Sequence, residues 1–331
     1  MNKTSNIQAA GSAIGRSAAS FQRKMRMYYC GWDGGGTKTE VCVLHENGET
    51  VSRSFGPLNL NGASRETVEK TVRDAVEFIR SQREGLEGCA MLVIGMAGVS
   101  NRDAAQMMEQ MVREAGYAGP LRLVGDQEIA LAGAIRDHGA VLIAGTGAIC
   151  YGRDRDGNSF RVGGWGHLID DGGSGYAIGR DILMAAVRAE DGRGKDTCLK
   201  QAVFEALTVR DIRGVITWLY APGTGKKEIA SLAPLLLPAL ETGDEAAQAI
   251  AEKAAADLSE LVLAGWRKTG MEDGEIAMTG SILNRYAPIR ALTEERIRAA
   301  LPKVNVISPR FSPAYGAASM AREALERLYG A

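Results

Sequence analysis

The chain has 331 residues, of which 45% are hydrophobic and 24% charged, and its formal net charge is −1. This length is enough for two domains with cores of their own. A near-neutral balance with 6% aromatic residues does not favour nucleic acid or a membrane surface as a partner, and we expect neither. No apolar run reaches the length of about 18 residues that a membrane span needs.

Five cysteines, widely spaced and without a C-x-x-C pair, occur at Cys30, Cys42, Cys89, Cys150 and Cys198. Such scattered cysteines inside apolar runs predict reduced, buried thiols in a cytoplasmic protein.

The first 27 residues differ from the rest, with five Lys/Arg and no acidic residue. They lack the continuous apolar centre of a secretory signal. A transit peptide, or a start codon placed too early ahead of Met25 or Met27, is an alternative reading. We expect a disordered extension, residues 1–27, outside the fold.

From residue 28 the pattern alternates between strands and helices. YYCGWDGGG and TKTEVCVLHENGE predict two strands joined by a glycine turn, with ENGE as the next turn. Val68, Val72, Val76 and Ile79 follow helical spacing. Further along the chain we expect a strand, a helix, a short strand and a helix, at 90–98, 103–116, 121–126 and 127–139. This series predicts an α/β fold with a covered sheet.

The scheme restarts near residue 140. AVLIAGTGAICYGRDRDGNSFRVGG again predicts a strand, a glycine–threonine turn, a second strand, a charged turn and a third strand. This weak internal repeat suggests two related halves, each opening with a hairpin. After it we expect a helix, a mostly helical stretch, a strand, another helix and a closing helix, at 176–191, 196–270, 275–280, 285–299 and from about 313.

The spacing of the glycine residues excludes the common phosphate motifs. Position 39 is Thr where the dinucleotide fingerprint needs its third glycine, and Lys38 lacks the preceding G-x-x-x-x-G of a Walker A loop. APGTGKKE at 221–228 also fails, because Lys227 stands where Ser or Thr is needed, and we expect a solvated turn before a helix there. The kinase motifs H-R-D and D-F-G do not occur.

A hairpin cradle is the remaining interpretation of DGGGTKT at 33–39. A strand, a tight turn and a second strand place the backbone N–H groups of Gly34–Thr37 around an anion. Thr37 and Thr39 add hydroxyls and Lys38 adds a cation. The Asp33 carboxylate is suited to Mg²⁺, held through water. A plain glycine-rich hairpin with a surface Asp is the alternative.

Two later segments strengthen the interpretation as a nucleotide site. The GTG turn at 145–147 offers a second cradle with Thr146, and we expect the two hairpins to face each other across a cleft. MTGS at 278–281 ends a strand in glycine and allows an adenine to lie flat on the backbone. The predicted ATP-binding residues are Gly35, Gly36, Thr37, Lys38, Thr39, Thr146, Gly280 and Ser281.

Together, DGGGTKT, GTG and MTGSILNR resemble the actin, hexokinase and chaperone ATPase superfamily. GGWGHLIDDGGSGY at 163–176 is more specific and resembles the N-acetylglucosamine kinase branch, which also contains activating ATPases of benzoyl-CoA reductase type. The resemblance covers residues 28–331. It implies two ribonuclease-H-like domains with an interdomain cleft: 28–138, with the helix at 314–331 packing back on it, and 139–313.

The resemblance also implies site residues. Asp126 matches the catalytic aspartate that accepts the proton of the sugar 6-hydroxyl, although an Asp there can equally be the N-cap of the helix at 127–137. Asn59, with Asn61 as its competitor, matches a sugar-contacting asparagine. The remaining sugar-binding positions implied in this way are Gly147, Gly164, Asp171 and Gly175. ATP and Mg²⁺ are the implied cofactors, and a homodimer is the implied assembly.

Three neighbouring side chains in the 163–176 segment have a structural alternative. Trp165 can wall the pocket or lie in the core, whereas Asp170 and His167 are expected to be structural. One position departs from the family. Animal N-acetylglucosamine kinases carry a sugar-contacting asparagine two places after the GTG turn, where this chain has Ile149.

The leading hypothesis is therefore an ATP-dependent kinase that phosphorylates the 6-hydroxyl of N-acetylglucosamine, glucosamine, N-acetylmuramic acid or another amino sugar. An activating ATPase coupled to a partner reductase is the first alternative, and a non-catalytic sugar-sensing regulator is the second.

Overall fold

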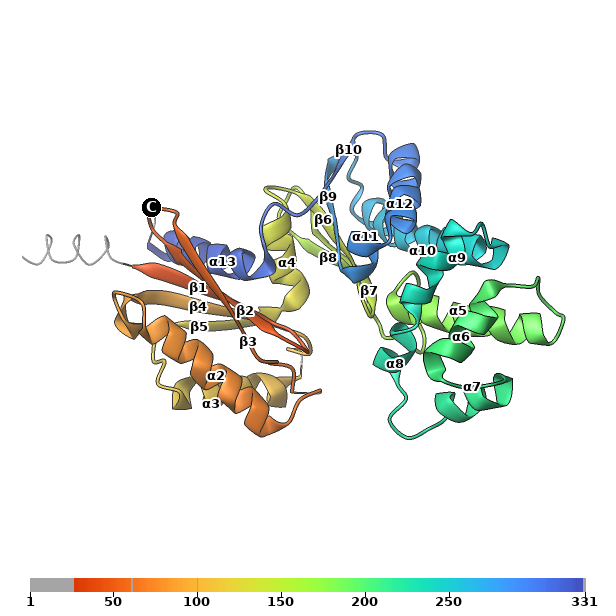
Figure 1. The fold of residues 1–331 in the computed structure, drawn as a ribbon. Helices are drawn as coiled ribbons and strands as arrows, with labels where there is room; N and C mark the ends of the chain where they lie inside the picture. The colour runs from red at the N-terminus through yellow and green to blue at the C-terminus, as the bar shows by residue number, and fades with distance from the viewer. Residues whose placement is uncertain (1–26, 61, 100, 330–331) are drawn as a thin grey trace, which may run out of the picture. The chain divides into compact units, whose positions relative to one another are not determined.

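The structure is a computed structural model that describes residues 27–60, 62–99 and 101–329. All but the last residue of the extension expected at 1–27 lies outside these ranges, as does Asn61. The chain forms two compact units (Figure 1). Unit 1 runs up to Ala134 and takes up the chain again from Arg310, and unit 2 spans Ile135–Pro309.

Unit 1 contains a mixed five-stranded sheet in the order β3-β2-β1-β4-β5. The first three strands are antiparallel neighbours, whereas β4 runs parallel to β1, and β5 runs parallel to β4. The strands are β1 (Tyr28–Gly34), β2 (Thr39–His45), β3 (Thr50–Phe55), β4 (Cys89–Met96) and β5 (Leu121–Gly125).

Unit 2 repeats this topology with the order β8-β7-β6-β9-β10. Again the first three strands in the chain are antiparallel neighbours and the last two are parallel to the central strand. The strands are β6 (Gly139–Ala144), β7 (Ala148–Arg153), β8 (Ser159–Gly163), β9 (Gly274–Thr279) and β10 (Val304–Ile307). The internal repeat predicted from the two glycine hairpins is thus confirmed as a repeated topology.

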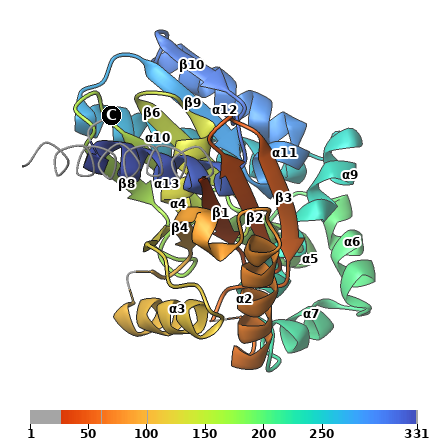
Figure 2. The same ribbon diagram turned by 90° about the vertical axis from the view of Figure 1, so that its left-hand side faces the viewer.

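Four helices cover the two faces of the first sheet (Figures 1 and 2). They are α2 (Arg65–Arg80), α3 (Arg102–Glu114), α4 (Asp126–Ala134) and α13 (Pro313–Tyr329). In α2 the predicted apolar stripe is buried, and Ser64 caps the helix by accepting a hydrogen bond from the Thr67 N–H. Side chains of α2 and α3 pack on the β1 residues Tyr28, Cys30 and Trp32.

The opposite face of β1 is covered by α13, the last helix in the chain. Its buried residues Ala314, Ala317, Ala318 and Ala321 repeat at helical spacing and pack beside strand and α4 residues. A Cβ placed on Gly31 would lie 2.2 Å from the Ala314 carbonyl oxygen. The small side chains and the glycine therefore let helix and strand backbones approach directly.

Unit 2 is richer in helices, which pack on the face of its sheet that carries Ala140, Leu142 and Cys150. The long helix α10 begins at an Asp244 N-cap and ends at Gly270, whose φ is 67°. The helices are α5 (Gly175–Glu190), α6 (Cys198–Leu207), α7 (Ile212–Leu219), α8 (Lys226–Ala230), α9 (Leu236–Glu241), α10 (Glu245–Thr269), α11 (Ser281–Arg285) and α12 (Ala287–Ala300).

Some sequence-based expectations need correction. The edge strands β3 and β10 were not predicted: β3 is almost entirely exposed and so lacks an alternating pattern, and β10 is only four residues long. Helix α4 begins at Asp126 and ends at Ala134, rather than spanning 127–137. Four cysteines are buried as expected, whereas Cys198 is exposed.

The close contact between β1 and α13 leads to a prediction about the stability of a Gly31 variant. Gly31→Ala would place its methyl group 2.2 Å from both the Ala314 oxygen and the Ala318 nitrogen. Because backbone atoms cannot rotate away, we expect the free energy of unfolding to fall by about 2 kcal/mol or more, as in overpacked cores. Urea denaturation measures this change. Gly225→Ala, whose Cβ would meet nothing nearer than 3.5 Å, is the control, and equal midpoints for the two variants would contradict the prediction.

Candidate active site

The first glycine hairpin forms an open turn between β1 and β2. The Gly35 N–H donates to the Lys38 carbonyl at 3.0 Å, which closes the turn. Gly36, Thr37 and Lys38 are exposed at its tip. The cradle predicted for phosphates is therefore accessible, with a hydroxyl and an ammonium beside the exposed backbone.

Thr39 does not contribute in the way expected. Its side chain is fully buried, and its hydroxyl donates to the carbonyl of Gly56 at 2.8 Å. The hydroxyl therefore ties β2 to the end of β3 and is not available to phosphate in this structure. Thr39 is the first residue of β2, a strand in which alternate side chains point to a buried face, whereas Thr37 lies in the turn. This explains why the Thr39 side chain is buried and that of Thr37 is exposed.

The register of three parallel strands brings Asp33 and Asp126 to one edge of the sheet. Gly34 on β1 pairs with Met96 on β4, which pairs with Gly125 on β5. Asp33 directly precedes Gly34 in the chain, and Asp126 directly follows Gly125. With strands spaced about 4.8 Å apart, the row is about 10 Å wide. Residues 93 positions apart are thus placed beside the same hairpin.

Burial and the nearby Asp126 carboxylate raise the pKa of Asp33 to about 6, with a smaller contribution from Glu40 and an opposing one from Lys38. A carboxyl held in this way gains from any cation that binds beside it. Carboxylate oxygens are ligands that Mg²⁺ prefers, so the donor chemistry at this edge fits a magnesium ion.

Asp126 is exposed at the first position of α4. One of its carboxylate oxygens accepts a hydrogen bond from the next N–H, that of Gln127, at 3.0 Å. Glu128 accepts from the Gly125 N–H at 3.0 Å and so stabilises the beginning of the helix. The start of α4 therefore does not depend on Asp126 alone.

Asn59 lies close to the hairpin. A Cβ on Gly36 would be 3.9 Å from the side-chain nitrogen of Asn59. The loop that carries Asn59 is held by the Leu58 N–H, which donates to the Gly35 carbonyl at 3.0 Å. Unit 1 thus brings together Asp33, the exposed hairpin, Asn59 and Asp126.

In unit 2 the GTG turn docks on the beginning of α5. The N–H of Gly175 donates to the Gly145 carbonyl at 2.7 Å, and that of Tyr176 to the Thr146 carbonyl at 3.4 Å. Ser174 caps the same helix. The end of the conspicuous 163–176 segment is therefore fixed directly on the second hairpin.

The strand-end segment MTGS lies beside the same turn. A Cβ on Gly280, whose φ is 100°, would be 2.3 Å from the Ala144 carbonyl oxygen. The hydroxyl oxygen of Ser281 is 3.8 Å from the Cβ position of Gly145. Only glycine allows this approach, and it places Gly280 and Ser281 beside the second hairpin.

Asp171 is buried behind the GTG turn, with 3% of its side chain exposed. One carboxylate oxygen accepts from the Ala148 N–H at 3.3 Å, and the other is 2.7 Å from the ammonium nitrogen of Lys226. A Cβ on Gly147 would lie 2.9 Å from that ammonium and 3.0 Å from the carboxylate. Gly147 therefore leaves room for an ion pair directly under the turn.

Lys226 is the residue that motif analysis missed. The GTGKK sequence predicts a solvated turn before a helix, and a turn followed by α8 is present. However, α8 packs so closely on α5 that a Cβ on Gly179 would be 2.0 Å from the Ile229 carbonyl oxygen. This approach brings Lys226 to Asp171, and no local spacing in the sequence signals it.

Gly164 lies beside one side chain from β7 and one from β8. Its φ is 74°, and a Cβ there would be 3.0 Å from Cδ1 of Ile149 and 3.1 Å from a terminal nitrogen of Arg161. Trp165 is 65% exposed, so it is not a core residue. The carboxylate of Asp170 accepts from the Trp165 N–H at 3.0 Å, and the ring of His167 packs edge-on against Tyr176.

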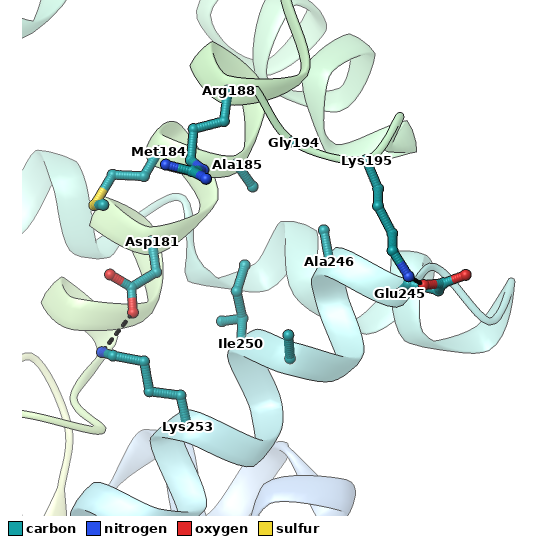
Figure 3. Close-up of a pocket in the computed structure, with 11 residues that line it drawn as sticks. Asp181, Met184, Ala185, Arg188, Gly194, Lys195, Glu245, Ala246, Ile250 and Lys253 are labelled. Carbon is teal, nitrogen blue, oxygen red and sulfur yellow. Dashed lines mark hydrogen bonds and ion pairs between the residues drawn. The ribbon is translucent and has the colours of Figure 1, made fainter. Parts of the chain in front are cut away.

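A cavity of about 440 Å³ lies elsewhere in unit 2, between α5 and α10 (Figure 3). Two of its lysines are paired with acids: Lys253 with Asp181 at 2.8 Å, and Lys195 with Glu245. None of the predicted site residues lines this cavity. Both lysines are neutralised in this way, most of the other lining residues are apolar, and Arg188 is the remaining cation.

Residues 27–60, 62–99 and 101–329 contain neither a metal-binding cluster nor a membrane-spanning helix. No three His, Cys, Asp or Glu side chains in this part of the chain gather closely enough to bind a metal ion by themselves. No helix there combines the length and the apolar character needed to cross a bilayer.

The repeated sheet order, with a glycine hairpin opening each unit, defines the actin-like ATPase fold to which sugar kinases belong. Residues 30–321 match the family described as the BadF/BadG/BcrA/BcrD ATPase family. The chain belongs to this family, and the resemblance inferred from its motifs is confirmed.

Named relatives support the same branch. The chain is 35% identical over 300 residues to the N-acetylmuramic acid/N-acetylglucosamine kinase of Clostridium acetobutylicum, covering 89% of this chain and 98% of that protein. It is 30% identical to the N-acetyl-D-glucosamine kinase of Dictyostelium discoideum, covering 88% and 97%. A crystal structure from Chromobacterium violaceum, of a protein proposed to be an N-acetylglucosamine kinase, has a TM-score of 0.73 at 25% identity, covering 90% and 99%.

The raised pKa of Asp33 leads to a prediction about how the free energy of unfolding depends on pH. Between pH values of about 4 and 6 the folded protein binds this proton more readily than the unfolded chain, so stability falls as pH rises through that range. We expect Asp33→Asn to raise the free energy of unfolding by up to about 3 kcal/mol above pH 6 and to leave it unchanged below pH 4.

Denaturation at pH 3.8 and pH 7.5 measures the effect of Asp33→Asn. Glu87→Gln removes an exposed carboxylate of the same unit and is the control. If Asp33→Asn is no more stable than wild type at pH 7.5, the assigned pKa is wrong.

Proposed function

We propose that the protein is an ATP-dependent amino-sugar kinase that transfers the γ-phosphoryl group of ATP to the 6-hydroxyl of N-acetylglucosamine or a related amino sugar. The observation that supports this function most is the strand pairing of Gly34 with Met96 and of Met96 with Gly125. Because of this pairing, the exposed carboxylate of Asp126 lies at the same end of the sheet as the open hairpin. The family membership and the names of the relatives support the choice of substrates.

In the proposed reaction Asp126 accepts the proton of the sugar 6-hydroxyl. The hydroxyl oxygen forms a bond to the γ-phosphorus while the bond from that phosphorus to the β-γ bridging oxygen breaks, and ADP leaves. The exposed backbone of Gly35 and Gly36 binds phosphate oxygens, and Thr37 and Lys38 add a hydroxyl and a cation. Phosphoryl transfer depends mainly on such positioning and charge neutralisation.

Asp33 is the proposed magnesium ligand, acting through water. A bound Mg²⁺ would neutralise charge on the phosphates during transfer. Burial and the Asp126 carboxylate raise the pKa of Asp33 to about 6, and a divalent cation beside the carboxyl would favour its ionised form.

Unit 2 supplies the remaining proposed contacts. Thr146, Gly280 and Ser281 bind the nucleotide, and Gly147, Gly164 and Gly175 offer backbone to the sugar. Asp171 accepts hydrogen bonds from sugar hydroxyls with a carboxylate held in place by the Ala148 N–H and Lys226. Lys226 is therefore a positioning residue for Asp171.

A screen for ATP consumption across amino sugars tests the function directly. We expect production of ADP and of a 6-phosphorylated sugar that depends on both sugar and Mg²⁺, with the product identified by NMR. ATP hydrolysis without a sugar phosphate would contradict the proposal. The homodimer implied by the family resemblance is a further proposal, tested by sedimentation equilibrium.

Asp126→Asn tests the proposed base. Asparagine keeps the size of the side chain but cannot accept the proton, so we expect kcat to fall at least about a hundredfold. Asp103→Asn, an exposed position in the first turn of α3, is the matched control. Near-normal turnover by a folded Asp126→Asn enzyme would refute the assignment.

Lys226→Met tests the positioning of Asp171. Without the ammonium the buried carboxylate loses a charge-assisted hydrogen bond, and we expect KM for the sugar to rise about tenfold, a loss of about 1.4 kcal/mol. KM for ATP should change much less. Lys227→Met, at the exposed neighbouring position, should behave like wild type.

In the Asp171→Asn background, Lys226→Met should add little further loss, because the two residues act as one unit. Equal changes in both KM values would assign Lys226 to the nucleotide instead.

A further inference from the structure

Arg161 holds a guanidinium group beside the glycine loop assigned to the sugar. It lies on β8, where its backbone pairs with that of Tyr151 on β7. Its Nε donates to the Gly163 carbonyl at 3.0 Å, and a terminal nitrogen donates to the Gly164 carbonyl. The guanidinium carbon lies 4.3 Å from the ring centre of Trp165. Two carbonyls and an aromatic face therefore fix the orientation of the cation.

The charge of Arg161 is not balanced by an acid. Within the described part of the chain, no carboxylate oxygen forms an ion pair with its guanidinium. By contrast, Arg155 pairs with Asp273 at 2.5 Å, and Arg180 pairs with Asp181 at 3.0 Å. An oriented guanidinium that is partly buried and has no carboxylate partner is suited to receive an external anion.

Ile149 is an aliphatic neighbour of Gly164. Ile149 approaches the Cβ position of Gly164 to 3.0 Å, and the Arg161 terminal nitrogen approaches it to 3.1 Å. Ile149 cannot donate a hydrogen bond to a sugar hydroxyl, whereas its side chain can pack on a methyl or methine group. A cation and an aliphatic group thus stand side by side at one sugar-contacting glycine.

We propose that Arg161 binds a carboxylate carried by the sugar itself, and that the preferred substrates are amino sugars with a carboxylated ether substituent, the class of N-acetylmuramic acid. The lactyl ether of such a sugar has a carboxylate for Arg161 and a methyl group for Ile149. This inference rests on the proposed function and specifies the substrate of the same site.

The substrate side of the test needs no mutation. Wild-type kcat/KM is measured for N-acetylmuramic acid, its methyl ester and N-acetylglucosamine. A charge-assisted bond to the carboxylate predicts that the free acid exceeds its methyl ester by about tenfold or more. Equal values for acid and ester would overturn the proposal, because the ester keeps the bulk of the ether and loses only the charge.

The protein side uses Arg161→Gln, with Arg155→Gln as the matched control on an exposed arginine of the same unit. We expect Arg161→Gln to lower kcat/KM for N-acetylmuramic acid about tenfold more than for N-acetylglucosamine, through KM rather than kcat. Arg161→Lys keeps the charge but not the planar fork and should recover part of the preference. The control should leave the ratio of the two sugars at its wild-type value.

Other outcomes separate the two proposals. If wild type phosphorylates no amino sugar, the proposed function fails. If it phosphorylates N-acetylglucosamine but Arg161→Gln leaves the ratio unchanged, only the role of Arg161 is overturned. A rise in KM for ATP that is equal with both sugars would assign the guanidinium to the nucleotide phosphates and would overturn it as well.

Discussion

Close approach of one backbone to another, at positions where no side chain fits, positions the candidate residues within each of the two units. Gly31 lets α13 lie on β1 beside the strand end that carries Asp33. Gly179 lets α8 lie on α5, and Gly280 brings the end of β9 to the second hairpin. At each of these three positions a single methyl group would push the two backbones apart, so the glycines set the local geometry around the candidate residues.

The sequence predicts those parts of the fold that have strong local signals. Alternation and glycine turns indicated both hairpins, and helical spacing indicated α2, because each pattern reflects a buried face. The edge strands β3 and β10 were missed because an edge strand has little buried face to leave a pattern. The shared sheet order of the two units was visible only as a weak repeat, since a topology can persist with few identical residues.

Within the candidate site, motifs located the residues that act through the backbone or at strand ends. Long-range contacts were harder to foresee. Lys226 reaches Asp171 across 55 positions because of helix packing, and Arg161 acquires its place from the register of β7 and β8. Thr39 shows the opposite error: its position in a motif suggested a ligand, whereas strand alternation buries its hydroxyl. Side-chain direction, not residue type, decides these cases.

The discontinuity of unit 1 has a consequence for synthesis on the ribosome. The alanine face of α13 completes the core around β1, yet α13 follows the whole of unit 2 in the chain. The nascent N-terminal sheet therefore waits, with one face of its central strand uncovered, until some 175 further residues have been translated. Unit 2 is continuous and can fold first. A chain that ends before residue 310 would keep α2 and α3 on one face of β1 but would leave the face that α13 covers exposed, and exposed apolar surface of this kind favours aggregation and binding by chaperones.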